Sequence, residues 1–287
     1  MIAQLVLNGL VTGAIVALPA IALTLTFGIL KFPNFAIGAM LTMGAYGGWT
    51  LNALFGMSLL AATVLSATAM AVIAMAIDRL VFVHLREREG LTLLVASMGV
   101  AFVLENICRF AFGNDARNLD IAVARPVRWN GLRVNHEQII TGGSVLACLV
   151  VLFLVVRFTP LGRAMRAVAD NPSLAAARGI ERDSIIAVTW AIVGGLCALA
   201  GTLIALDRAI DPLMGWNYQI NVFAAAILGG LGSLFGAVVG ALVIGVVEEL
   251  SALVIPTNYR QAIGFAMIVL LLLLRPQGLF GTVAIRK

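Results

Sequence analysis

Ionisable side chains inside apolar segments are the first candidates for chemistry, because a charge within a bilayer is costly and is usually functional or paired. Glu105 and Arg109 lie four residues apart, in the order that favours an ion pair on one helix face. We interpret them as a structural pair near the end of their helix. Glu248 and Glu249 could attract a cationic group or a soluble partner, and carboxylates exposed at a helix end would fit them equally well. The helix middles lack the Asp or Glu that a proton relay needs.

Motifs for catalysis are absent from the sequence. Its two histidines, His84 and His136, fall in loops predicted on opposite sides of the membrane, so they cannot share a metal or activate one nucleophile. The patterns G-x-S-x-G, H-E-x-x-H and G-x-x-x-x-G-K-[ST] do not occur, and the glycine-rich stretch 229–236 lacks the lysine of a phosphate-binding loop. The sequence therefore predicts neither an enzyme nor a bound cofactor or metal. If ATP is consumed, ATP and Mg²⁺ bind to another chain.

The composition is that of an integral membrane protein. Hydrophobic residues make up 61% of the 287 and charged residues only 11%, against about 25% charged in an ordinary soluble domain. About eight apolar segments approach or exceed the 20 or so residues of a helical crossing; they cover roughly 2–30, 32–54, 57–83, 91–112, 138–157, 184–206, 219–250 and 259–275. We therefore expect residues 1–287 to form one all-α, polytopic transmembrane domain.

The distribution of basic residues orients this domain. If the polar stretch 160–179 is cytoplasmic and the spans alternate, the larger share of Lys and Arg falls on the cytoplasmic side, although the outer loop 113–137 carries several arginines. The same positive-inside effect explains the net charge of +5 better than a nucleic-acid partner does.

This orientation requires segment 219–250 to leave and return on the same side of the membrane. Its length is too short for two crossings, which need about 40 residues, so it predicts a re-entrant hairpin with its turn at 229–236; one long tilted helix is the alternative. A similar interruption occurs at 31–38, where Pro33 breaks the pattern and Asn34 enters an apolar run.

Interrupted segments in matching places of two halves are typical of a transporter's pathway. The candidate pathway residues are Asn34, Phe35, Gly38, Asn221, Gly229, Gly230 and Gly232. Half-helix N-termini beside the breaks could face the carboxylate of an amino acid. Asn34 and Asn221 could equally serve only to satisfy freed backbone groups.

The polar stretch 160–179 predicts two short helices between two long apolar segments. On helical spacing one face collects Leu161, Ala164, Met165 and Val168. Asn171 is a good N-cap, Pro172 suits the first helical position, and Gly179 can adopt the left-handed conformation that ends a helix. A chain that only needed to turn around would use fewer residues. The stretch therefore indicates a docking surface for something outside the lipid.

Four blocks of sequence carry a resemblance to a known family. They are TLTFGI at 24–29 with NFAIG at 34–38 and GAY at 44–46, TPLGRAMRA at 159–167, GGLGSLFGAVVG at 229–240, and RPQGLFG at 275–281. In this order they resemble the permease subunits of bacterial ABC importers for branched-chain amino acids, the LivH/LivM type and more closely LivH. The resemblance covers essentially the whole length. Phe32 and Pro33 depart from the aliphatic residues more usual before the Asn-Phe-Ala motif.

The resemblance implies a multi-pass subunit of the bacterial inner membrane, in contact with lipid, that translocates its substrate inward. It implies as partners a second permease, either a homologous chain or a second copy, two cytoplasmic ATPase subunits and a periplasmic substrate-binding protein. It also implies a coupling element within 158–183, which carries the role of ATPase coupling onto Gly162, Arg163, Arg166, Asp170, Asn171, Pro172 and Gly179.

Two questions stay open at this stage. Branched-chain amino acids, other amino acids, urea, short amides and aromatic acids all fit a permease of this type. A secondary transporter or channel driven by an ion gradient is the alternative function, although it would need no docking helix and would usually carry acidic residues in its helix centres.

Overall fold

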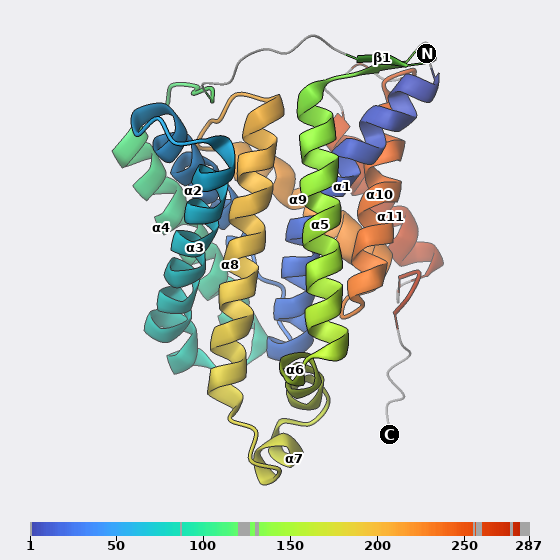
Figure 1. Cartoon of the computed structure of the whole chain (residues 1–287). Coiled ribbons are helices and arrows are strands. Elements are labelled where there is room, and N and C mark those ends of the chain that lie inside the picture. Colours follow the sequence, from blue (N-terminus) through green and yellow to red (C-terminus); the bar gives the residue numbers. More distant parts are fainter. Residues whose placement is uncertain are drawn as a thin grey trace.

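The chain is almost entirely helical in the computed structural model (Figure 1). The structure describes residues 2–86, 88–119, 127–129, 132–254, 256, 260–275 and 278–281. The expected all-α class is confirmed. Within the described residues, strands are confined to one antiparallel hairpin, β1 (Val127–Trp129) and β2 (Leu132–Val134), in which Val127 lies opposite Val134.

The helices follow the predicted segments, with shorter elements where the pattern is interrupted. They are α1 (Ile2–Leu30), α2 (Ala36–Trp49), α3 (Leu59–Ile77), α4 (Gly90–Phe112), α5 (His136–Phe158), α6 (Pro160–Asp170), α7 (Pro172–Ala177), α8 (Arg182–Asp207), α9 (Met214–Gly229), α10 (Leu234–Ser251) and α11 (Arg260–Leu274). A π-helical turn (Thr50–Leu54) extends α2, and a π-helical turn (Asp78–Phe82) with a 3-10 turn (Val83–Leu85) extends α3.

The exact count of about eight hydrophobic segments, which was to include interrupted or re-entrant helices, is not confirmed. Among the described residues, six helices are long and apolar enough to cross a membrane: α1, α3 with its extension to Leu85, α4, α5, α8 and α10. The segments predicted at 32–54 and 259–275 form the shorter α2 and α11, of 14 and 15 residues.

Small residues hold the long helices together. Helices α1 and α10 run antiparallel (Figure 1), and a Cβ atom on Gly13 would lie 2.6 Å from the carbonyl oxygen of Ala241. Such close backbone approach is how helices pack in lipid, where there is no hydrophobic driving force between them. Helix α8 packs against α1, α2 and α3, and its buried Trp190 stacks on Phe82 at 4.9 Å between ring centroids.

The segment predicted to form a hairpin does so. Helices α9 and α10 are joined at residues 230–233, where Gly230 and Gly232 have φ of +97° and +100°. Two helices meet at this turn, so the alternative of one long tilted helix is wrong. However, α9 begins at Met214, earlier than the predicted 219, and α10 alone has the length of a span. The non-helical backbone therefore lies before Met214 as well as in the glycine turn.

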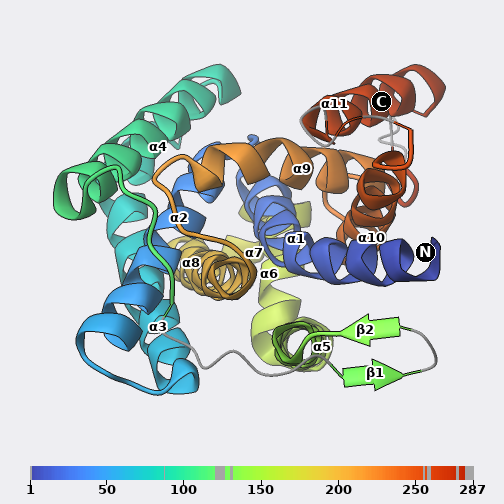
Figure 2. The ribbon, with the colours of Figure 1, turned by 90° about the horizontal axis from the view of Figure 1, so that it is seen from above.

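The two ends of the molecule differ in structure. The β-hairpin and the start of α1 lie at one end, and α6 and α7 project from the other (Figure 1). Seen along the helices, α4 and α11 stand on either side of α9, while α5 lies on the opposite face (Figure 2). The molecule thus presents one face flanked by two helices and, separately, an end from which α6 and α7 project.

Candidate functional site

Two short helices begin inside the helical body. Helix α2 follows the non-helical residues 31–35, and α9 follows residues 208–213. Each lead-in segment is anchored by buried residues: Phe32 and Asn34 in the first and Ile210 in the second are 0–1% exposed. Irregular backbone at membrane depth is tolerated only where protein or a cavity surrounds it. The start of each helix is therefore held by neighbouring helices.

Backbone N–H groups in the first turns of α2 and α9 find their hydrogen-bond acceptors on each other's helix. The backbone N–H of Gly38 donates to Gln219 Oε1 at 2.6 Å, and the N–H of Gly215 donates to Thr42 Oγ1 at 2.9 Å. The hydroxyl of Thr42 in turn donates to the carbonyl oxygen of Gly38 at 3.2 Å. Amides in a first helical turn have no partner within their own helix. Each half-helix therefore supplies the acceptor that the other requires.

Asn34 satisfies a backbone group freed by the interruption. Its Oδ1 accepts a hydrogen bond from the N–H of Ala36 at 3.0 Å, while the N–H of Phe35 donates to Ser97 Oγ at 3.1 Å. One donor remains on each side of the crossing, because Asn34 Nδ2 and Gln219 Nε2 are buried without a hydrogen-bond partner. A buried, unpaired donor is rare in a native protein unless it meets water or a ligand.

A cavity of about 520 Å³ lies against this crossing. Its lining includes Phe35, Trp216, Gln219, Phe223 and Phe265. The walls come from the lead-in to α2, from α9 and from α11, so the cavity lies on the face that α4 and α11 flank (Figure 2). Aromatic side chains with a few amides form a site suited to a small solute that has both apolar and polar groups.

The other predicted pathway residues lie elsewhere. Asn221 Nδ2 donates to Glu248 Oε2 at 3.0 Å inside the α9–α10 pair. Gly229 packs backbone to backbone on Gly236, and its carbonyl oxygen accepts from the N–H of Phe280 at 3.1 Å. The interruption at 34–38 is therefore matched by the one before Met214, not by residues 221–236.

Sequence reasoning missed Thr42 and Gln219. Gln219 stands in an alternating run of amides with Asn217 and Asn221 at the start of a predicted apolar segment, and that pattern was the available signal.

The structure shows the surroundings of the carboxylates noted in the sequence. Arg109 Nη2 lies 2.7 Å from Glu105 Oε1, which confirms the expected pair. Glu248 and Glu249 are only 7% and 8% exposed. The alternative that Glu248 and Glu249 are exposed carboxylates at a helix end is therefore wrong.

The two helices predicted in the polar stretch are confirmed. Thr159 Oγ1 accepts from the N–H of Gly162 at the start of α6, and Asn171 Oδ1 accepts from the N–H of Leu174 at the start of α7. Gly179 has φ +79° just after α7. The buried face of α6 carries Met165 and Val168, as the spacing predicted.

The seven candidate coupling residues divide into two groups. Gly162 and Arg166 attach α6 to the end of α5: a Cβ on Gly162 would clash with the carbonyl oxygen of Val156, and Arg166 Nη1 donates to that same oxygen at 2.5 Å. The other five are exposed; they are Arg163, Asp170, Asn171, Pro172 and Gly179. Helix α7 projects beyond the long helices (Figure 1), so this end is accessible to a partner.

A charged cluster beside this end was not foreseen. Arg86 Nη2 lies 2.5 Å from Asp78 Oδ2, and Arg86 Nη1 also pairs with Asp183 in the first turn of α8. The side chains of Arg86 and Asp78 are 7% and 1% exposed. Since α8 follows α7 along the chain, Arg86 connects the end of α3 to the start of the helix that leaves the polar stretch.

Buried half-helices, span-length helices and two capped helices projecting at one end are the features expected of a class of protein, the permease subunits of membrane transporters. The chain matches the family described as "Branched-chain amino acid transport system / permease component" over residues 5–272. It belongs to this family of permease components.

Individual relatives agree with this assignment. The chain is 30% identical to the high-affinity branched-chain amino acid transport system permease protein LivH of Escherichia coli (strain K12), over 99% of this chain and 97% of the relative. It is 31% identical to the corresponding permease protein BraD of Pseudomonas aeruginosa, over the same shares. An inward-facing structure of a putative metal-chelate type ABC transporter shares the fold, with a TM-score of 0.52 and 17% identity over 95% of this chain and 87% of that one.

The protein is thus a multi-pass membrane permease of the ABC importer type. Permeases of this type are not enzymes themselves, and they work with ATPase subunits and a substrate-binding protein.

Proposed function

We propose that this chain imports a branched-chain amino acid, or a small zwitterion of similar shape, across the inner membrane of a bacterium. The observation that carries the proposal is the crossing of α2 and α9. The N-terminal ends of two half-helices, which carry partial positive charge, meet there beside the unpaired donors Asn34 Nδ2 and Gln219 Nε2. The adjoining cavity has aromatic walls that suit an aliphatic side chain. Relatives named as branched-chain amino acid permeases support the same substrate class.

The pathway in this proposal runs along the face between α4 and α11. A second permease, either a homologous chain or a second copy, closes it from the other side. Large apolar side chains are exposed on this face; they include Phe102, Trp216 and Phe265. Apolar side chains of this kind suit lipid as well as protein, so the support for a protein cover is the pair of unpaired donors at the crossing beneath them, Asn34 Nδ2 and Gln219 Nε2.

Two cytoplasmic ATPase subunits bind ATP and Mg²⁺ in this proposal, and one of them receives α6 and α7. This chain then needs no cofactor of its own. Arg163 is the best candidate for direct contact, because it is exposed and its guanidinium makes no hydrogen bond or ion pair with a described residue. Arg166 is less informative, since its guanidinium already holds the end of α5.

Transport by the reconstituted complex tests the function. Proteoliposomes containing this chain, its cognate second permease and the ATPase subunits should accumulate labelled leucine, isoleucine or valine only with ATP and the cognate binding protein. Uptake by this chain alone, driven by a proton or sodium gradient, would instead establish the secondary transporter.

Charge reversal at Arg163 tests the coupling surface. We expect Arg163→Glu to lower the recovery of ATPase subunits at least about tenfold, because an unfavourable charge at an interface costs more than the 1.4 kcal/mol that this factor represents. Arg79→Glu is the matched control, since Arg79 is also exposed at the same end but lies on α3's extension. Equal recovery of the two variants would exclude α6 as the docking helix.

A further inference from the structure

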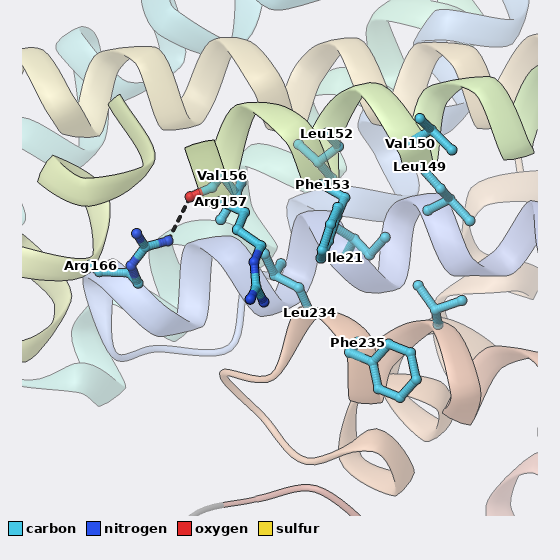
Figure 3. A pocket seen from close by; sticks show the side chains of 11 residues that line it. Ile21, Leu149, Val150, Leu152, Phe153, Val156, Arg157, Arg166, Leu234 and Phe235 are labelled. Carbon is cyan, nitrogen blue, oxygen red and sulfur yellow. Dashed lines mark hydrogen bonds between the residues drawn. The ribbon is translucent and has the colours of Figure 1, made fainter. Parts of the chain in front are cut away.

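An apolar groove runs along the outer face of the molecule between α5 and α10, with α1 as its floor. Its volume is about 440 Å³. The walls come from Leu149 and Phe153 of α5 and from Phe235 and Val238 of α10, and Ile21 of α1 lies beneath them (Figure 3). The groove lies away from the face that α4 and α11 flank (Figure 2). It is therefore separate from the cavity at the α2–α9 crossing.

Two arginines stand at one end of this groove. Figure 3 shows Arg157, near the end of α5, and Arg166, on α6, at the same end of the groove. The guanidinium of Arg157 lies over the ring of Phe153 at 5.7 Å from its centroid, and Arg157 is otherwise exposed. Arg166 uses Nη1 to bind the carbonyl oxygen of Val156, and its side chain also lines the groove. Both charges lie at the end of the molecule that carries α6 and α7, which the positive-inside effect makes cytoplasmic.

A second groove, on the other side of α5, provides a comparison within the molecule. It measures about 460 Å³ and runs between α3, α5 and α8, with Val151 and Val155 of α5 in its wall. Its described lining contains no charged side chain. The arginines are therefore a property of the α5–α10 groove, not of every apolar depression along α5.

We propose that the α5–α10 groove binds an anionic glycerophospholipid of the cytoplasmic leaflet. An acyl chain lies along Leu149, Phe153 and Phe235, and the phosphate lies between Arg157 and Arg166. Basic pockets between transmembrane helices on the cytoplasmic side recognise anionic headgroups, and each arginine near such a surface contributes to affinity. Because Arg166 belongs to α6, the bound headgroup contacts the coupling element as well as α5. The occupant is thus a lipid whose charge complements the groove.

Retention of lipid by the purified transporter complex tests this site. The complex is exchanged into detergent with equal amounts of dioleoyl phosphatidylglycerol and dioleoyl phosphatidylcholine, and bound lipid is measured by native mass spectrometry. We expect preferential retention of phosphatidylglycerol. Arg157→Gln should weaken that retention about fivefold, the factor that one arginine contributes, while Arg157→Lys should preserve most of it. Arg79→Gln, which removes an exposed arginine at the same end but outside the groove, should change nothing.

Filling the groove gives an independent test. Val150 lines this groove and is 50% exposed, while the adjacent Val151 lines the second groove and is 60% exposed. We expect Val150→Trp to reduce retained phosphatidylglycerol and Val151→Trp to leave it unchanged.

Three results would overturn the proposal: equal retention of the two lipids by the unmodified complex, equal losses in Arg157→Gln and Arg79→Gln, or loss of a protein subunit but not of lipid in Val150→Trp. The last result would mean that a protein covers the groove. Since the readout is bound lipid and not uptake, failure here is distinguishable from failure of the proposed transport function.

Discussion

Arg86 is a buried cation shared by carboxylates of two different helices. Its partner Asp78 is almost fully buried, whereas Asp183 is three-quarters exposed. Breaking a buried ion pair from one side leaves the other charge without compensation, which costs about 3–5 kcal/mol. The exposed pair with Asp183 adds little energy by itself. Its importance is positional, because it holds the first turn of α8, just after the proposed coupling element, against the end of α3.

The Arg86 cluster predicts a rescue by double substitution. We expect Arg86→Met to destabilise the purified protein by about 3 kcal/mol, and Asp78→Leu combined with Arg86→Met to recover most of that loss, since an apolar pair can replace a buried ion pair. Denaturation in detergent measures both variants. Arg88→Met serves as the control, because Arg88 is exposed nearby. A double variant no more stable than Arg86→Met would contradict this prediction, because it would mean that loss of Arg86 does not leave an uncompensated charge on Asp78.

Local interactions were accessible to sequence reasoning, and distant ones were not. The ion pair of Glu105 and Arg109 was predicted from their spacing. The roles of Asn171 and Gly179 at the two ends of a helix were predicted from the chemistry of helix ends. Each of these features depends on neighbours within a turn or two. Arg86 and Asp183 are 97 positions apart, and Gly38 and Gln219 are 181 apart. No periodicity connects such residues, so only the folded chain reveals them.

At the scale of elements, the crossing of α2 and α9 depends on two glycines. A Cβ atom on Gly215 would clash with the carbonyl oxygen of Gly38, and one on Gly38 would lie 2.5 Å from the carbonyl oxygen of Gly215. The interruption at 31–38 was predicted from Pro33. Its counterpart at 208–213 was not, because Asp207 and Arg208 made that stretch resemble an external loop. The backbone then returns inward through the half-buried Asp211 and the buried Pro212, which the sequence pattern did not indicate.

Substitution of one of these glycines should separate the half-helices. We expect Gly215→Ala to destabilise the protein by about 1–3 kcal/mol, as overpacking does, and to reduce uptake through loss of the paired hydrogen bonds. Gly99→Ala is the control: it lies in α4 with no atom within 4 Å of a new Cβ, and alanine favours the helix. Melting temperature and transport rate measure the two effects. An unchanged melting temperature and transport rate in Gly215→Ala would mean that α2 and α9 are farther apart at the crossing than the structure shows.

At the scale of the whole molecule, one helix connects the docking end to the crossing. Helix α8 has 26 residues and is therefore about 39 Å long. It begins at Arg182, just after the coupling element and beside the Arg86 cluster, and ends at Asp207, just before the lead-in to α9. In the proposed mechanism, movement of α6 and α7 with an ATPase subunit reaches the half-helices through this rigid element.

This mechanism requires α7 to be cytoplasmic and the loop after α4 to be external, which cysteine labelling can test. Ala176 in α7 and Ala116 after α4 are both exposed and small, so each accepts a cysteine with little disturbance. We expect a membrane-impermeant maleimide to label Ala116→Cys in spheroplasts with an intact inner membrane, and Ala176→Cys only after that membrane is permeabilised. The unsubstituted protein provides the background, because Cys108 and Cys197 are buried and Cys148 lies within α5. The reverse pattern would place α7 outside, where no ATPase could reach it, and would remove the basis for coupling through α8.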